Sequence, residues 1–585
     1  MSRHTEMKRV ATTLGAAFLF VFNIFAFGPY TIYQGNIDEF TIPLSSILIS
    51  FILPALVFLS VLCLIGLLLS EKAHKLYVST LFTLGVLVWL QGNFLVWEYG
   101  LFDGQGIDWS KNAWRGWADG ALWAGLLILA CLFNRKVYRI VAWGSAVITA
   151  VLVMSLLITS LQMPETWAAK EKSSRPLVPP EEIFEFSSQF NIVHIVLDGY
   201  QSDIFAEVIA EDFSRYSKSL EGFTFFKEAM GSFPTTFMSI PAFLSGRVYK
   251  NDIPARRFLN EVKQGKTIFN ALYDRGYETS IVSDPLFVKG GRYSNHYQIA
   301  IPYGGTGRQN RRSNSALMVD LVLFRHAPHF LKKYVFNDQA WLIQRFFTPK
   351  NYAINPRYFS HAAFLDDMIG HLAVKQDKPV YKYIHLMTSH FPLVVNKDCV
   401  YAGKIRPTRD NIKIQAKCVL NHIIKFLDRL RDKGLYDSSL IILQSDHGQG
   451  HKISMTNMEN PRDEVNFIEN KSLPAIAGRA LALVVIKPPQ KKDDFSISRA
   501  QISLTDIPAT LSSLLNIDEK FDGRSVFEVH PDEVRERRFY HHEWRKTSWQ
   551  KSFFPRLDEF VVTGSVFDRN SWRKGITLYP PGRSE

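Results

Sequence analysis

The sequence predicts an N-terminal bundle of five transmembrane helices followed by a C-terminal α/β domain with a mostly parallel sheet. Two observations support this fold class. Five apolar stretches follow one another before residue 163, and each is long enough to cross about 30 Å of hydrocarbon as a helix. Beyond them, short apolar runs of strand length alternate with helical patterns, which is typical of a sheet covered by helices on both faces.

The membrane assignment rests on the length and the number of the apolar stretches. Globular cores rarely contain five such runs in series. No small-residue cleavage site follows the first run, so a cleaved signal peptide is the weaker interpretation of it. The spans are expected at residues 10–29, 43–69, 76–97, 116–134 and 138–162.

Basic residues on alternate loops predict the orientation. Arg9 precedes the first span, Lys72 follows the second and Arg135 follows the fourth, whereas the other loops are acidic or mixed. The positive-inside rule assigns the basic loops to the cytoplasm, and an odd number of spans then puts the soluble domain on the other face. We therefore expect a multi-pass protein of the cell inner membrane whose soluble domain is periplasmic or otherwise extracytoplasmic.

Charge and cysteine content narrow the function classes only slightly. The net charge of +13 is not accompanied by a basic helix or an aromatic–basic ladder, so nucleic acid is not an expected partner. Attraction to anionic head groups of the lipid bilayer is the simpler explanation. Cys63 and Cys131 lie in spans, whereas Cys399 and Cys418 would be able to pair in an oxidising compartment, and that pairing stays open.

The expected organisation is a transmembrane domain over residues 1–162, a proline-containing linker over 163–189 and one soluble domain over 190–585. Strand-like runs in the soluble domain close at Asp198, Asp284, His385 and Asp446, and a further run covers 480–488. Helical patterns are found at 203–220, 237–246, 267–275, 315–333, 358–374 and 410–434.

Polar side chains close several of the apolar runs. Asp198, Asp284, His385 and the pair Asp446–His447 all come at the carboxyl end of an expected strand. Ligands of open α/β sheets bind outside this edge, so these side chains are expected at one rim. One aspartate after a strand is more often a helix cap or a turn residue, and the repetition is what favours a shared site.

Three of these residues form a ligand set suited to zinc or manganese, namely Asp198, Asp446 and His447. Gly448 is expected to let the backbone turn sharply beneath the ion. The Asp-His-Gly tripeptide is weak by itself, and an additional ligand that is also a nucleophile would strengthen it.

A candidate nucleophile lies in the segment GSFPTTFMSIPAFLSG, residues 231–246. Pro234 suits a helix start, which puts Thr235 and Thr236 at a helix N-terminus, where free amides and the helix dipole favour negative charge. Metal coordination would make a threonine hydroxyl alkoxide-like. The alternative, that both threonines only cap the helix, stays open.

The order of the segments LDGYQSD, PTTFMSIPAFLSG, HLMTSH and SDHG resembles the alkaline phosphatase superfamily in its sulfatase-like branch. With five spans ahead of the domain, the chain is similar to membrane-anchored phosphotransferases: lipid A phosphoethanolamine transferases, lipoteichoic acid synthases and phosphoglycerol transferases of periplasmic glucans. The resemblance covers residues 190–530 in motif order, including TDIPATLSSLLNI and GRSVF near its end. It implies a sulfatase-like catalytic domain.

The resemblance also implies roles for single residues. The family's nucleophilic threonine lies five residues before the proline of a T-x-x-S-x-P pattern, which selects Thr236 as the catalytic residue. It further implies one divalent cation, zinc or manganese, held by Asp198, Thr236, Asp446 and His447.

Three histidines resemble substrate-contacting residues of the family. His385 and His390 are similar to two histidines that contact the transferred phosphate or a second ion, and His390 is the candidate for leaving-group protonation. His451 resembles a distal substrate-binding histidine, although its spacing of four from His447 is short for the family.

The implied function is a two-step transfer of a phospholipid head group, phosphoethanolamine or phosphoglycerol, through a phosphoester on Thr236 to a glycan or lipid acceptor. The C/S-x-P-x-R motif of formylglycine sulfatases does not occur at the nucleophile, which disfavours sulfate ester hydrolysis, and the many cysteines of phosphoethanolamine transferases are missing. A hydrolase of phosphodiesters or sulfate esters, a metal-free envelope regulator and a transporter with a receptor domain are the alternatives. The sequence does not predict an oligomeric state.

A few further polar residues carry weaker expectations. His194 points along an apolar strand and is expected to be a core histidine, whereas His541 and His542 fit either the site or an exposed late loop, and the loop is the favoured interpretation. Two groups allow either a lipid head-group contact or a simpler role: Gln91 and Asn93 near the end of the third span, and Arg308, Arg311 and Arg312 in a polar stretch.

Overall fold

The computed structural model divides the chain into two compact units. Unit 1 comprises Met1–Leu177 and Gly305–Ile354, and unit 2 comprises Val178–Gly304 and Asn355–Glu585. The chain therefore passes between the units three times. The structure describes residues 3–582 except 38–39, 41, 98, 100–106, 108, 111–112, 168–178, 284–286, 288–290, 302, 304–306, 338–339, 348–355, 469–470 and 543–552. Asp284 and much of the expected linker lie outside the described residues.

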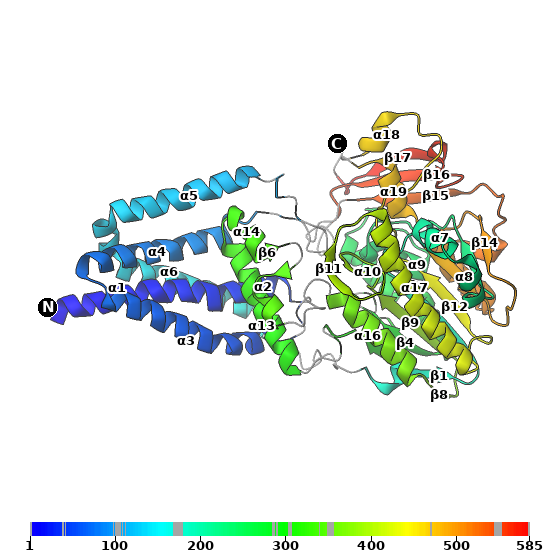
Figure 1. The fold of residues 1–585 in the computed structure, drawn as a ribbon, viewed down its shortest axis with the longest axis horizontal. Helices are drawn as coiled ribbons and strands as arrows, with labels where there is room; N and C mark the ends of the chain where they lie inside the picture. The colour runs from blue at the N-terminus through cyan, green and yellow to red at the C-terminus, as the bar shows by residue number, and fades with distance from the viewer. Residues whose placement is uncertain are drawn as a thin grey trace. The chain divides into compact units, whose positions relative to one another are not determined.

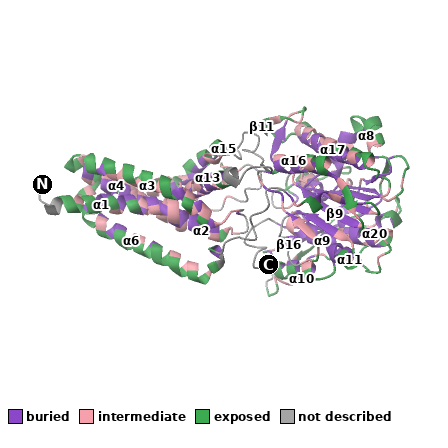
Figure 2. Ribbon diagram, turned by 90° about the horizontal axis from the view of Figure 1, so that it is seen from below, coloured by how far each residue is buried: buried purple, intermediate pink, exposed green. Residues whose placement is uncertain are grey.

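Unit 1 contains five helices long and apolar enough to cross a membrane, which confirms the expected spans (Figure 1). The first span, Glu6–Gly35, joins α1 (Arg3–Phe22) to α2 (Gly28–Gly35) through a π-helical turn. Large apolar side chains are exposed along the outer faces of the bundle, as expected of surfaces that lipid covers (Figure 2). The other spans are α3 (Leu44–Leu68), α4 (Glu71–Asn93), α5 (Ala113–Leu132) and α6 (Asn134–Gln162).

Residues 305–354 belong to unit 1, which corrects the expectation of one continuous soluble domain over 190–585. Met318 and Val322 of the helix expected at 315–333 pack into a buried apolar cluster with residues of α2 and α3. The periodicity correctly indicated an apolar face, but its partner is the membrane bundle. The segment contains α13 (Gly307–His326), α14 (His329–Val335), β6 (Phe336–Asn337), β7 (Ala340–Trp341) and α15 (Gln344–Phe347).

Polar side chains at one end of the bundle fix this segment. Arg325 donates from Nε to the carbonyl oxygen of Gly92 at 2.7 Å, in the last turn of α4. Gln91 donates to Asp119 of α5 at 3.2 Å and accepts from Trp123, so it contacts another helix. Asn93 instead bonds the carbonyl of its own helix at Trp89.

The described residues of unit 2 form one eight-stranded, mostly parallel sheet in the order β14-β3-β13-β12-β2-β9-β4-β5. The neighbours β12, β2, β9, β4 and β5 run parallel, whereas β13 pairs antiparallel with β12 and β3. The strands are β2 (Asn191–Leu197), β3 (Thr224–Phe226), β4 (Glu278–Val282), β5 (Asn295–Tyr297), β9 (Val380–Leu386), β12 (Leu440–Gln444), β13 (Val484–Lys487) and β14 (Ser496–Ser498).

Helices cover both faces of this sheet, as the alternation of strands and helices predicts (Figure 2). On one face, apolar side chains of α9, α11 and α20 join those of β2, β9 and β12 in one core, and α16 and α17 lie on the other. The helices are α7 (Ser202–Ala210), α8 (Phe213–Ser219), α9 (Thr236–Ser245), α10 (Ala255–Gln264), α11 (Ile268–Asp274), α16 (Pro356–His371), α17 (Arg409–Asp432), α18 (Pro461–Val465), α19 (Leu473–Ala480) and α20 (Ile507–Leu514).

Smaller sheets flank the main one. A three-stranded antiparallel sheet is formed by β15, β16 and β17, while β1 pairs with β8 and β10 with β11. The loop before β11 contains Cys399, which forms a disulfide with Cys418 of α17. These strands are β1 (Glu185–Ser187), β8 (Ala373–Gln376), β10 (Leu393–Val395), β11 (Tyr401–Ile405), β15 (Glu536–His541), β16 (Leu557–Thr563) and β17 (Trp572–Leu578).

Candidate metal centre and nucleophile

The carboxyl ends of three neighbouring parallel strands carry three of the predicted site residues. Asp198 directly follows β2, His385 is the penultimate residue of β9, and Asp446 comes two residues after β12. Because β2 lies between β12 and β9, these residues from distant parts of the sequence reach one rim. Each strand is buried along its whole length, and the two carboxylates come only beyond the last residues of β2 and β12.

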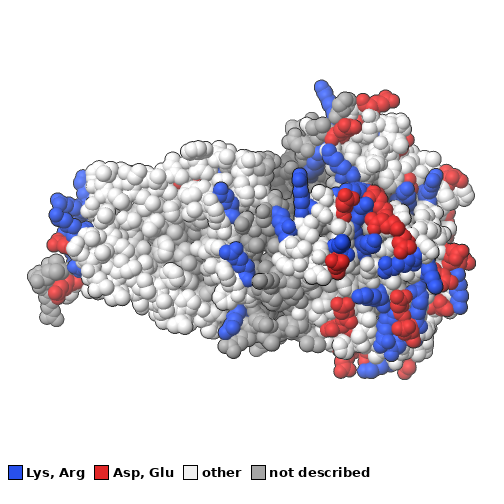
Figure 3. All heavy atoms as spheres, viewed as in Figure 1, with Lys and Arg blue, Asp and Glu red and all other residues white. Residues whose placement is uncertain are grey.

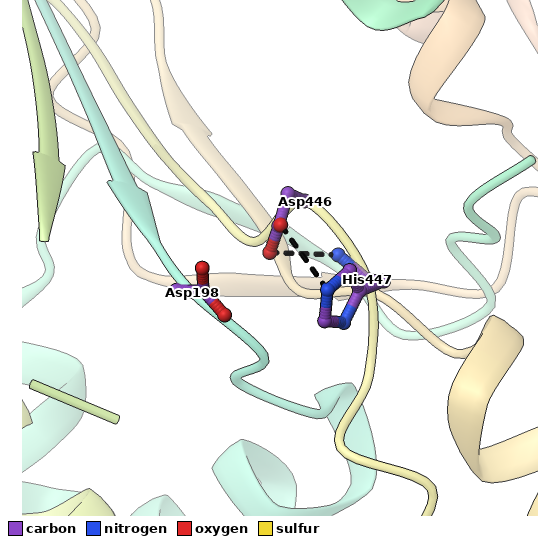
Figure 4. A group of neighbouring side chains, drawn as sticks. All are labelled: Asp198, Asp446 and His447. Carbon is purple, nitrogen blue, oxygen red and sulfur yellow. Dashed lines mark hydrogen bonds and ion pairs between the residues drawn. The ribbon is translucent and has the colours of Figure 1, made fainter. Parts of the chain in front are cut away.

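Asp198, Asp446 and His447 offer one ligand atom each, and these atoms all lie within 4.8 Å of one another (Figure 4). Oδ1 of Asp446 accepts hydrogen bonds from the backbone amides of Gly199 at 3.1 Å and His447 at 3.0 Å. Oδ2 of Asp446 and Oδ1 of Asp198 accept no hydrogen bond from any residue that the structure describes, although both are buried. Buried carboxylate oxygens without donors are costly unless a cation approaches them.

The orientation of His447 suits a metal ligand. Its Nδ1 lies 2.9 Å from the carbonyl oxygen of Gly448, so this nitrogen carries the proton and Nε2 keeps a free lone pair. Nε2 faces the carboxylate of Asp446 at 3.3 Å. Burial lowers the pKa of His447, which keeps the ring neutral.

Gly448 is required here for a different reason from the sharp turn that the sequence suggests. Its φ is not in the left-handed region, which among neighbouring glycines is adopted by Gly199 and Gly450. A Cβ atom on Gly448 would instead collide with the backbone carbonyls of Gly478 and Leu481. The close approach of α19 to the metal loop therefore excludes a side chain at this position.

Thr236 meets the cluster from the first turn of α9. Its Oγ1 donates to Oδ2 of Asp198 at 3.2 Å and lies 3.4 Å from Nε2 of His447. Thr235 is the N-cap residue by backbone conformation, but its hydroxyl makes no capping hydrogen bond. In the described contacts, therefore, neither threonine serves only as a helix cap. Thr236 contacts the ligand cluster, and Thr235 points away from it.

Thr235 contacts His542, for which the sequence predicted an exposed loop. Both His541 and His542 are buried, which corrects that expectation, and Oγ1 of Thr235 lies 3.2 Å from Nε2 of His542. His542 follows β15, and pairing of β15 with β16 holds this end of the strand inside the domain. Burial lowers the pKa of His542 to about 3, with Lys471 and Arg479 adding to the shift, so the ring is neutral.

His385 and His390 both face Asp198. Nε2 of His385 lies 3.3 Å from Oδ2 of Asp198, and Nε2 of His390 lies 4.0 Å from Oδ1. Burial alone would raise the pKa of Asp198, but the imidazoles of His390 and His385 outweigh it and hold the pKa far below its ordinary value. Asp198 is therefore an anion, as a metal ligand must be.

His451 has no described contact with this cluster, unlike the other predicted histidines. Its backbone amide donates to Oε1 of Gln201 at 2.7 Å, and its ring packs edge-on against Phe391 with centroids 5.0 Å apart. It lines a small cavity with Tyr200, Gln201 and Phe391, among others. His451 follows His447 closely, and Gly450 between them has a φ of +82°. This left-handed turn directs the chain away from the cluster before His451.

Two residues near the cluster carried no signal in the sequence. His361 of α16 accepts from the backbone amide of Met387 at 3.2 Å, and burial lowers its pKa to about 3, with His385 contributing. Ser389 donates to the carbonyl oxygen of Asp198 at 2.7 Å. By contrast, His194 is fully buried with Nδ1 3.0 Å from the hydroxyl of Tyr381, which confirms the expected core histidine.

The donor set fits a divalent cation. Two carboxylates, a neutral imidazole and an alcohol oxygen are hard to borderline ligands of the kind that zinc and manganese bind in proteins. The acceptor atoms left without donors on Asp198 and Asp446 point to the same conclusion. Asp198, Thr236, Asp446 and His447 are therefore the residues that would hold the ion.

The comparison with protein families shows the type of domain. The family profile described as Sulfatase matches residues 191–517. No curated protein matches the chain at a significant level. Among solved structures, the chain is similar to an alkaline phosphatase superfamily protein from Vibrio parahaemolyticus, with 12% identity and a TM-score of 0.38, covering 66% of this chain and 78% of that one.

Two further solved structures are similar at the same level. One is the lipoteichoic acid synthase LtaP from Listeria monocytogenes, with 11% identity and a TM-score of 0.36 over 69% of this chain and 90% of that one. The other is the zinc complex of the C-terminal periplasmic domain of EcEptC from Escherichia coli, with 11% identity and a TM-score of 0.35 over 68% of this chain and 94% of that one.

Proposed function

The chain belongs to the sulfatase family of enzymes, and from that premise we propose that it is a membrane-anchored, metal-dependent phosphotransferase. It moves a phospholipid head-group phosphoester, phosphoethanolamine or phosphoglycerol, to a glycan or lipid acceptor of the cell envelope. The five spans support a lipid donor, because an anchored enzyme meets a membrane lipid at high effective concentration. The distribution of basic loops supports an inner-membrane protein with a periplasmic or extracytoplasmic catalytic domain.

The observation that carries the proposal is the position of the Thr236 hydroxyl. It lies within hydrogen-bonding distance of both Asp198 and His447, at the first turn of a helix whose free amides favour a developing negative charge. A divalent cation held by this cluster, zinc or manganese, would supply two things: a lower pKa for the alcohol and neutralisation of charge on the phosphoryl oxygens.

The chain's own residues account for a balanced two-step transfer. Oγ1 of Thr236, whose proton has first passed to water, forms a bond to the head-group phosphorus, and the bond from phosphorus to the diacylglycerol oxygen breaks; the second step returns Oγ1 in the same deprotonated form. His390, the more exposed of the two histidines facing Asp198, gives the leaving oxygen its proton. In the second step an acceptor hydroxyl returns a proton to His390 as its oxygen bonds to phosphorus, and the bond to Thr236 breaks. His385 orients the phosphoryl group beside Asp198.

Trapping the phosphoester on Thr236 tests the proposal directly. The full-length protein is incubated in mixed micelles with phosphatidylethanolamine or phosphatidylglycerol, quenched in acid and analysed by peptide mass spectrometry. We expect an adduct on Thr236 of about 123 Da from the first lipid or about 154 Da from the second, by the composition of the covalent intermediates. Thr236→Ala should abolish both the adduct and the release of diacylglycerol.

The same experiment separates the alternatives. Head-group release to water at the same rate with and without acceptor glycans would identify a hydrolase. Diacylglycerol release that Thr236→Ala leaves unchanged would overturn the proposed nucleophile. Thr235→Ala is the matched comparison: it removes a neighbouring hydroxyl that does not contact Asp198 or His447 in the described structure, so the adduct on Thr236 should still form, although more slowly.

A further inference from the structure

The segment of residues 305–354 leaves the catalytic unit and joins the membrane unit, and its composition is unusual. It contains eight Lys and Arg residues against two Asp, interleaved with apolar and aromatic residues. Of the basic residues expected to hold lipid phosphate or form a solvated loop, Arg311 and Arg312 are exposed on α13. The side chain of Arg308 lies outside the described residues.

Packing within unit 1 fixes where this segment lies along the spans. α13 packs against α2, the last part of the first span, and against α3 and α4. Its buried Met318 and Val322 meet Leu44 and Ile47 at the beginning of α3, and Arg325 bonds Gly92 at the end of α4. These contacts all occur at the end of the bundle that carries the loops 36–43 and 94–112. The segment therefore lies at one membrane boundary of the bundle.

The short helices after α13 expose large apolar side chains next to cations. Tyr334 of α14 is 61% exposed and Phe346 of α15 is 71% exposed. Lys333 lies over the ring of Tyr334, at 5.1 Å from its centroid, and Arg345 lies over the ring of Phe346, at 4.9 Å. Exposed aromatic rings paired with basic groups are typical of the interface between head groups and acyl chains, where each part meets its preferred surroundings.

The charge pattern of unit 1 agrees with this location. On the face shown in Figure 3, the spans present a long surface without charges, and Lys and Arg side chains border it at both ends. The exposed apolar side chains of α14 and α15 belong to the same compact unit as these spans, whose own exposed apolar side chains suit a lipid environment. Basic side chains at such a boundary attract anionic head groups.

We propose that α14 and α15 form an interfacial anchor whose occupant is a phospholipid bilayer carrying anionic head groups. The rings of Tyr334 and Phe346 enter the boundary of the acyl region, while Lys333 and Arg345 contact lipid phosphates. Asp119 fixes the anchor to the bundle by accepting the backbone amide of His329 at 2.9 Å. The inference does not depend on which reaction the catalytic unit performs.

Photocrosslinking tests the apolar half of the proposal. The full-length protein with benzoylphenylalanine in place of Phe346 is reconstituted in nanodiscs that contain phosphatidylcholine and phosphatidylglycerol, irradiated and analysed by mass spectrometry. Benzoylphenylalanine in place of Ile576, an apolar residue of unit 2 that is 61% exposed, is the matched control. We expect phospholipid adducts at 346 and none above background at 576. Equal lipid labelling at both positions, or crosslinks from 346 to protein only, would overturn the anchor.

The composition of the adducts tests the charged half. In the same nanodiscs, adducts at 346 should contain more phosphatidylglycerol than the bulk lipid does. Lys333→Gln with Arg345→Gln should reduce this enrichment, by up to roughly fivefold for each basic residue. Lys425→Gln with Lys433→Gln, which removes two exposed cations of unit 2, should leave it unchanged. Adducts at the bulk lipid ratio in the unaltered chain would show that the anchor does not select anionic lipid.

Discussion

The carboxylate of Asp119 in the fourth span accepts a hydrogen bond from the backbone amide of His329, 210 residues later in the sequence, at 2.9 Å. The same carboxylate accepts from Trp97 at 2.9 Å and from Gln91 at 3.2 Å. Asp119 is 1% exposed. One buried acidic group therefore joins two spans, the segment after the third span and the beginning of α14.

Loss of the Asp119 carboxylate is expected to release α14 from the bundle. Asp119→Ala removes the acceptor of the buried backbone amide of His329, at a cost of about 1–3 kcal/mol, and also the contacts with Trp97 and Gln91, of which Gln91 keeps the carbonyl of Leu95 as an acceptor. We expect faster hydrogen exchange of the α14 amides in nanodiscs, with exchange in the main sheet of unit 2 unchanged. Asn93→Ala is the control, because among the described residues the Asn93 side chain bonds the carbonyl of Trp89 in its own helix. Unchanged exchange of α14 would mean that its apolar contacts hold it without this carboxylate.

His542 is expected to position the residue next to the nucleophile. Since His542 bonds Thr235, its replacement by Ala should lower kcat by roughly tenfold through a shift of the first turn of α9, with a smaller effect on KM. His542→Gln, whose amide nitrogen replaces Nε2, should recover much of the loss.

A double-mutant cycle with Thr235→Val distinguishes positioning from a loss of packing. If the hydrogen bond carries the effect, the double variant should be little slower than either single variant. Additive losses would instead assign the effect of His542 to its contact with the ring of Phe554, whose centroid lies 4.2 Å away.

Metal removal is expected to lower both the turnover and the thermal stability of unit 2. A cation that binds only the folded cluster stabilises it by about 2.7 kcal/mol at a hundredfold excess over Kd. Chelation should lower Tm by several degrees, and zinc or manganese should restore it. Asp446→Asn should abolish this response, whereas Asp410→Asn, a change at an exposed carboxylate of α17, should preserve it. A Tm of Asp446→Asn that rises as in the unaltered chain would contradict the ligand assignment.

Acid is expected to destabilise unit 2 through His194. Burial lowers the pKa of His194 from 6.5 to about 4. Between these values the unfolded chain binds a proton that the folded chain does not, so stability rises with pH across this window and is lost as pH falls toward 4. The contribution approaches about 3 kcal/mol. His194→Gln should flatten the dependence of Tm on pH between 4 and 6.5, relative to the unaltered chain. If the dependence of Tm on pH in His194→Gln is as steep as in the unaltered chain, the loss of stability in acid comes from the other buried histidines.

The sequence predicted the sheet and the ligand rim because both follow from local patterns. Fully buried parallel strands read as continuous apolar runs, so the first polar residue after β2 and β12 marks the carboxyl end of each strand. Three such ends were enough to bring Asp198, His385 and Asp446 together, since neighbouring parallel strands share an edge.

The positions of α13 and His542 depend on distant partners, which local patterns do not specify. The apolar face of α13 fits a soluble core as well as a membrane bundle, and only its contacts with α2 and α3 decide between them. His542 is buried because β15 pairs with a strand that begins at Leu557. The role of His451 was inferred from the resemblance to a distal family histidine in spite of its short spacing from His447, and the left-handed turn at Gly450 changes the direction of the chain in between.

The three passages of the chain between the units affect how the catalytic part can be isolated for crystallisation. A fragment that starts after the linker would still contain α13 and α14, whose apolar side chains would then face water without the spans. Such a fragment is expected to aggregate unless detergent is added. A soluble version therefore requires a second edit, in which a short polar loop replaces residues 305–354.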